Sequence, residues 1–392
     1  MKRESALADS AFRFVLTIGI VNLFADMNYE GGGSINGAFL GSLGAGAAII
    51  SIAAGLGEFL GYSLRSVAGY VADRTGRHWT VTFLGYTLNM LAVPAMALAG
   101  SWPLAAALIL AERTGRALRK PPVEAMLSYT TGKHGRGWVY AVNTALDETG
   151  ATVGPLIVAA VLFLKGSYQS AYAVLLLPAL LALATLVAAR LRFPLPEKLE
   201  PEDTTSAKTF GASYWLSMIA AACFAAGLMS YELISYHLNT SGLMSQAWIP
   251  VLLAFATGSG VIANLILGKT YDRFGLPVLL LAVALSALFT PLALSTQHVW
   301  LVVAAMPLLG IGYAVQDTLL KALVAGMLPK GRRNLAFGLF YTGYGCGWLL
   351  GSVAMGLLYG SSRVALIGVA VVVQLGSLPI FQAANRRKLQ HA

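Results

Sequence analysis

The stretch GYVADRTGR, Gly69–Arg77, ends a long apolar segment and returns in part later in the chain as GKTYDRFG, Gly268–Gly275. Each copy follows an apolar segment and opens a charged turn. A second pair of matching stretches precedes them in the same order: MNYE at Met27–Glu30 and MSYE at Met229–Glu232. A duplicated unit explains both pairs, so the two halves of the chain are expected to share one arrangement of helices.

The composition places both copies in a membrane. Of the 392 residues, 57% are hydrophobic and 11% are charged, and the mean hydropathy is +0.69. Soluble domains are about 45–50% apolar and about 25% charged. Apolar windows of about 20 residues, the length that crosses a bilayer core, recur along the whole chain. The sequence therefore predicts an all-α polytopic membrane protein in contact with the lipid bilayer.

We expect twelve transmembrane helices in two pseudo-symmetric six-helix halves. The N-terminal half covers 1–191, the C-terminal half covers 211–392, and the polar, proline-containing stretch 192–210 is expected to be a cytoplasmic linker. The expected helices are 12–42, 44–72, 79–99, 102–130, 138–164, 168–191, 211–240, 244–269, 277–296, 298–328, 334–359 and 362–385.

Lysine and arginine placement predicts the orientation. These residues are concentrated at the two termini and in the loops expected on the same side of the membrane as the termini. The loops expected on the opposite side hold Lys165 and Arg363. Both termini are therefore expected in the cytoplasm, with the protein in a bacterial inner membrane. The net charge of +10 follows from this bias, so we expect no nucleic-acid partner. The first apolar run is too long for a signal peptide and is interpreted as a retained helix.

The repeated loop carries a G-x-x-x-D-R-x-G-R pattern, and the chain resembles the major facilitator superfamily over essentially its whole length. That resemblance implies two bundles that rock about a central site and gives the loop residues a role in conformational gating. The alternative is that this loop is an ordinary basic turn on the cytoplasmic side, with no role in conformational change. The pattern consists of Gly69, Asp73, Arg74, Gly76 and Arg77, with Asp272 and Arg273 in the partial copy.

A second motif is GATVGP, which contains Gly150, Gly154 and Pro155. It resembles the antiporter signature of drug-efflux members and implies a further role in gating. The alternative is that glycine and proline only pack and kink a membrane helix.

Charged residues gather in ERTGRALRKPPVEA, at Glu112–Ala125. The superfamily commonly has a membrane-embedded arginine in this helix. Arg113, Arg116 and Arg119 are the candidates for that role. The i, i+4 spacing predicts the pairs Glu112 with Arg116, Lys120 with Glu124, and Asp317 with Lys321. The substrate-binding candidates are Arg113, Arg116, Arg119, Lys120, Tyr29, Glu232 and Asp317.

The stretch FADMNYEGGGSING places Asp26 and Glu30 one helical turn apart, just before three glycines. Each glycine weakens a helix by about 1 kcal/mol relative to alanine, so we expect the helix to loosen or break just after Glu30. Ionisable groups at membrane depth are costly and usually functional. The candidate proton-coupling residues are Asp26, Glu30, Glu58 and Asp147, although Glu58 could instead pair with Arg65.

These patterns favour a secondary transporter that exports an organic compound in exchange for protons. The alternatives are uptake of an organic anion held by Arg116, Arg119 and Lys120, export of a divalent cation, and a channel or uniporter. An enzyme is not expected, because the H-E-x-x-H and G-x-S-x-G motifs are missing from the sequence. The expected partners are a small-molecule substrate and protons, with no cofactor, no metal site and a monomeric chain.

Overall fold

The computed structural model describes residues 2–75, 77–128, 136–164, 166–194, 211–294, 298–325 and 333–390, and among these residues it contains helices and no strand. The N-terminal half holds α1 (Lys2–Gly33), α2 (Asn36–Ser42), α3 (Ala47–Thr75), α4 (His78–Ala95), the 3-10 turn η1 (Met96–Leu98), α5 (Trp102–Ser128), α7 (Arg136–Phe163), α8 (Tyr168–Val174) and α9 (Leu176–Arg192).

The C-terminal half begins with two helices that a short break separates, as α1 and α2 are separated. It holds α10 (Ala212–Gly227), α11 (Tyr231–Ser241), α12 (Trp248–Phe274), α13 (Leu276–Ser286), α14 (Phe289–Leu294), α15 (Val299–Ala314), the π-helical turn η3 (Val315–Leu319), α16 (Leu320–Ala325), α17 (Arg333–Ser361) and α18 (Arg363–Gln390).

Each expected membrane helix overlaps one helix or up to three consecutive ones, and the ends expected at 130, 296 and 328 lie outside the described residues. Within the described ranges, 9 helical stretches are long and apolar enough to cross a membrane. The helix α5 is not among them because it carries the charged run around Arg116. The all-α membrane fold is confirmed, and the count of twelve crossings stays a prediction, as do the boundaries of the two halves and their linker.

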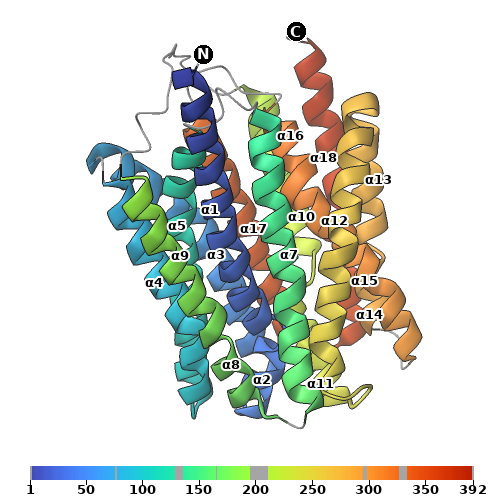
Figure 1. Ribbon diagram of the computed structural model, residues 1–392. Coiled ribbons are helices and arrows are strands. Elements are labelled where there is room, and N and C mark those ends of the chain that lie inside the picture. The colour runs from blue at the N-terminus through green and yellow to red at the C-terminus, as the bar shows by residue number, and fades with distance from the viewer. Residues whose placement is uncertain are drawn as a thin grey trace.

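The two halves lie side by side with related contacts (Figure 1). The helix α3 packs along α17, and α7 packs along α12. The helix α1 starts and α18 ends at the same end of the molecule, whereas α2, α8 and α11 lie at the opposite end (Figure 1). Which end faces the cytoplasm stays a prediction from the positive-inside rule.

Glycines set the closest helix approaches in both halves. On α7, a Cβ at Gly154 would lie 2.3 Å from the carbonyl oxygen of Met27 on α1. On α17, a Cβ at Gly351 would lie 2.1 Å from the carbonyl oxygen of Ala226 on α10. Small residues allow membrane helices to pack backbone to backbone, and here they do so at equivalent places in the two halves.

The break expected just after Glu30 comes after the three glycines instead, at Ser34 and Ile35. The helix α1 continues to Gly33, and the Glu30 carbonyl still accepts a hydrogen bond from the Ser34 N–H at 3.0 Å. A Cβ at Gly31 would lie 3.2 Å from the Gly154 carbonyl oxygen. Neighbouring helices therefore hold this glycine stretch helical, and tertiary packing overrides its low intrinsic propensity.

Candidate functional site

Arg113 on α5 is the centre of a buried ionic cluster. Its Nη1 lies 3.0 Å from Glu58 Oε1 on α3, its Nε lies 3.3 Å from Glu112 Oε2, and its Nη2 lies 3.3 Å from Glu232 Oε1 on α11. Buried ions need partners to offset the cost of leaving water. Because Glu232 belongs to the C-terminal half, this arginine links the two halves.

Glu232 reaches that position because the chain breaks between α10 and α11. The Ser230 side chain caps α11 by accepting a hydrogen bond from the Leu233 N–H, an ordinary N-cap arrangement. Glu232 therefore lies in the first turn of α11, close to the arginine of the other half. Its counterpart in the repeat, Glu30, instead lies in the last turn of α1, before the break that separates α1 from α2.

Arg119 is the centre of a second cluster and is only 2% exposed. Its Nη2 lies 3.5 Å from Asp26 Oδ1. Its Nε donates to Asn89 Oδ1 at 3.0 Å, and its Nη1 donates to Asn22 Oδ1 at 3.3 Å. The guanidinium carbon lies 4.6 Å from the centre of the Tyr86 ring, which adds a cation–π contact. Asp26 therefore has an arginine partner from α5.

Asparagine side chains join these clusters into one network. The Asn89 amide donates to Glu112 Oε1 at 2.8 Å. On the other side, the Asn22 amide donates to Asn143 Oδ1 at 3.0 Å, and the Asn143 amide lies 3.5 Å from Asp147 Oδ2. The network runs from α7 through α1, α4 and α5 to α11. Our sequence analysis considered only ionisable residues and missed these asparagines, although an amide in an apolar helix also needs a partner.

Arg116 and Glu30 differ from the paired residues around them. The Arg116 guanidinium lies over the Tyr29 ring, 4.3 Å from its centre, and its buried Nε has no hydrogen-bond partner. Within the described part of the chain, neither Arg116 nor Glu30 makes a side-chain ion pair. Tyr29 places the two residues close together, since Glu30 follows it on α1 and the Arg116 guanidinium covers its ring. The site thus holds an arginine and an acid whose charges interact without direct contact.

Two of the ion pairs expected along single helices do not form. Glu112 lies against Arg113 rather than Arg116, because the Arg116 side chain turns to the Tyr29 ring on α1. The described residues contain no pair between Lys120 and the exposed Glu124.

The remaining expected pairs have opposite outcomes. Glu58 does not pair with Arg65, because it lies against Arg113 on α5, and the Arg65 Nε donates to the Gly61 carbonyl at 2.9 Å. The pair Asp317 with Lys321 does form, with 3.6 Å between Oδ1 and Nζ. Both of these side chains are about half exposed, so the pair contributes little stability.

The loop motif lies at the end of α3, away from these clusters. Arg74 Nη1 donates to the hydroxyl of Tyr70 at 2.9 Å, and Arg77 is exposed. Gly69 lies on α3, and a Cβ there would lie 3.5 Å from Pro121. Gly76 and the Asp73 side chain lie outside what the structure describes. Asp272 and Arg273 are exposed at the end of α12, and the gating role of the motif stays a prediction.

The motif at Gly150–Pro155 lies where α7 packs on α1. A Cβ at Gly150 would lie 2.3 Å from the Leu23 carbonyl oxygen and 3.0 Å from the Asp26 Cβ. The motif thus brings α7 next to the acid that Arg119 holds. Its packing role is visible in the structure, and its role in antiport stays a prediction.

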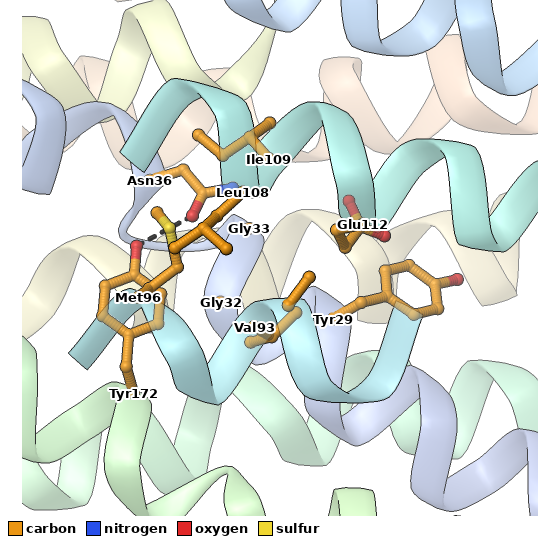
Figure 2. Close-up of a pocket in the computed structure, with 11 residues that line it drawn as sticks. Tyr29, Gly32, Gly33, Asn36, Val93, Met96, Leu108, Ile109, Glu112 and Tyr172 are labelled. Atoms are coloured by element: carbon orange, nitrogen blue, oxygen red, sulfur yellow. Dashed lines mark hydrogen bonds between the residues drawn. The ribbon is translucent and has the colours of Figure 1, made fainter. Parts of the chain in front are cut away.

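A small pocket adjoins the network on the side of α2 and α8. Figure 2 shows Asn36, Met96 and Tyr172 at one end of it, and Tyr29 and Glu112 at the other. The Tyr172 hydroxyl donates to Asn36 Oδ1 at 2.8 Å.

Comparison with known proteins identifies the family. Residues 18–288 and 210–388 match the model of the Major Facilitator Superfamily. The chain belongs to the major facilitator superfamily. As a superfamily member it is an integral membrane protein, and its fold supports secondary transport of a small-molecule solute.

Relatives of this superfamily member cover nearly its whole length. A protein of Mycobacterium tuberculosis is 36% identical over 377 residues, which is 94% of this chain and 92% of the relative. An MFS-type transporter of Methanocaldococcus jannaschii is 25% identical over 391 residues, covering 94% of each chain.

Solved transporter structures share the fold. The nucleoside transporter NupG has a TM-score of 0.71 at 13% identity, covering 95% of this chain and 98% of its own. An autoinhibited POT family peptide transporter has a TM-score of 0.77 at 14% identity, covering 96% and 97%. At these identities the likeness shows the fold alone.

Proposed function

We propose that this superfamily member is a proton-coupled antiporter that exports a small organic compound. The observation that carries the proposal is that Glu30 and Arg116 lie next to Tyr29 without an ion pair in the described part of the chain, whereas acids hold the neighbouring Arg113 and Arg119. A carboxylate that has no fixed partner can gain and lose a proton during a transport cycle. An arginine that has no fixed partner can hold that carboxylate in one state and release it in another.

The charge balance of the network supports proton coupling. The acids in and around the network are Asp26, Glu30, Glu58, Glu112, Asp147, Glu148 and Glu232, and the bases are Arg113, Arg116, Arg119 and Lys120. The acids outnumber the bases, and uncompensated buried carboxylates are expensive to keep ionised. Protons, or a cationic group of the substrate, are the species that would restore the balance, and competition between them at one site is the basis of antiport.

The position of Arg113 suggests how protonation couples to movement. It holds Glu58 of one half and Glu232 of the other, so it stabilises the state in which α3 and α11 lie together. A change of charge in the network alters the strength of that link. Protonation and alternating access then depend on each other.

The decisive experiment reconstitutes the protein in vesicles and uses a ligand found by thermal-shift screening, since binding to the native state raises the melting midpoint. Glu30→Gln imitates the protonated acid. We expect it to keep substrate binding and substrate-for-substrate exchange and to lose transport driven by a pH gradient. Asp26→Asn should share part of this phenotype, because coupled acids titrate as a unit.

The matched control is Glu124→Gln, an exposed acid on α5 outside the network, which should transport like the wild type. Gradient-driven transport that survives in Glu30→Gln would refute the role of Glu30. In that case Asp147 would be the next acid to replace.

A second candidate is uptake of an organic anion, which the unpaired Arg116 favours because a carboxylate or phosphate could occupy its free face. Right-side-out and inverted vesicles distinguish import from export. Export of a divalent cation has less support, since the described residues contain no group of three or more His, Cys, Asp or Glu side chains that could hold a metal.

A further inference from the structure

The pocket of Figure 2 lies entirely within the N-terminal half. Its walls come from α1, α2, α4, η1, α5 and α8, and Glu112 is the acid among its lining residues. It is not fully enclosed, and it is wide enough for a water molecule. Because its walls belong to one half, a movement of one half against the other leaves the pocket in place.

Glu112 lies where this pocket meets the ionic network. It is 5% exposed, its Oε1 accepts the hydrogen bond from Asn89 on α4, and its Oε2 lies 3.3 Å from the Arg113 Nε. That Nε makes no hydrogen bond of good geometry. One Glu112 oxygen is therefore firmly held, and the other has a weaker, mainly electrostatic partner.

The charges around Glu112 come from three helices. They are Arg113, Arg116 and Arg119 on its own α5, Glu58 on α3, and Glu30 on α1, with the hydroxyl-bearing Tyr29 also on α1. Loss of the Glu112 charge removes one of the three acids around Arg113. Arg113 then has Glu58 and Glu232 as its remaining acidic partners. Loss of the Glu112 charge therefore changes the ionic contact between the two halves.

We propose that Glu112 is a proton site of the transporter and that the pocket is its access route from the end where α2 and α8 lie. The proposal rests on the proton coupling proposed above. A proton arrives from water in the pocket, binds the Glu112 carboxylate and leaves to water at the opposite end after the halves have moved. The proton then reaches the network by a route inside one half, and it competes there with the substrate as proposed above.

Filling the pocket tests this route. Gly33 lines the pocket, and a Cβ at that position would meet no atom within 4 Å, so Gly33→Leu places a side chain into open space. We expect loss of pH-gradient-driven transport with retention of substrate-for-substrate exchange. The control is Gly376→Leu, the same change at an exposed glycine of α18 that also has no atom within 4 Å.

Glu112→Gln tests the proton site without relying on the pocket. The glutamine keeps an oxygen that can accept the hydrogen bond from Asn89. We expect this variant to lose the pH change that substrate addition causes in a weakly buffered solution of the purified protein. Coupling that survives in both Gly33→Leu and Glu112→Gln would overturn this inference and leave the antiporter proposal standing. A wild-type protein without gradient-driven transport would overturn both.

Discussion

At the residue scale, two arginines of α5 have opposite surroundings. Arg119 is 2% exposed and has a partner for each of its nitrogen groups, in Asn89, Asn22 and Asp26. Arg116 has the Tyr29 ring and no acid in contact among the described residues. Arg119 therefore holds the N-terminal half together, and Arg116 is free to act on a substrate or on Glu30.

We predict that Arg119→Ala lowers stability by about 3–5 kcal/mol, because it leaves the buried Asp26 without its charge partner. Arg116→Ala should abolish transport and leave the melting midpoint in detergent within a few degrees of wild type. Thermal melting of the purified variants, with transport measured in parallel, separates these roles. The opposite pattern, a stable Arg119→Ala and an unfolded Arg116→Ala, would show that the assignments are reversed.

At the element scale, the contact of α7 with α1 depends on glycine. We predict that Gly154→Ala costs about 1–3 kcal/mol, the range for overpacking a tight interior, because its Cβ would lie 2.3 Å from the Met27 carbonyl oxygen. Gly33→Ala enters open space and should be neutral or slightly stabilising, since alanine favours helix. Melting curves of both variants test this, and equal midpoints would mean that α7 can shift freely on α1.

At the scale of the whole molecule, the end that carries α2 and α11 is closed by backbone contact between the halves. A Cβ at Gly37 would lie 1.8 Å from the carbonyl oxygen of Glu232, and the Ala38 N–H donates to the Ser235 hydroxyl at 3.1 Å. At this contact between α2 and α11, which we call the seam, position 37 has no room for a side chain larger than hydrogen. The closed state therefore requires glycine at this position, whereas a state with this end open does not.

We predict that Gly37→Ala shifts the population toward the state in which this end is open. A Ser235→Cys probe, in a chain whose Cys223 and Cys346 are replaced by serine, should then react faster with a membrane-impermeant maleimide. Gly46→Ala, at the same end with no atom within 4 Å of its Cβ, should leave the labelling rate unchanged. Equal rates in the two variants would mean that the seam tolerates a methyl group.

The membrane fold, most of the helix positions and most of the buried charges could be predicted from the sequence, although α1 starts at Lys2, well before the expected residue 12. These features depend on local composition and on the repeat, so they can be recognised along the chain. The sequence also predicted a break near the three glycines, but not that the glycines themselves stay helical, because the packing of Gly31 on α7 depends on a helix more than a hundred residues away.

Which charges pair depends on the tertiary structure. The i, i+4 rule considers one helix at a time, whereas Arg113 takes Glu58 from α3 and Glu232 from α11, and Arg119 takes Asp26 from α1. A charge buried in a membrane needs a partner that replaces its contacts with water. The packing of the helices decides which partner lies within reach. The same packing left Glu30 and Arg116 without ion pairs among the described residues, in contrast to Arg113 and Arg119 of α5.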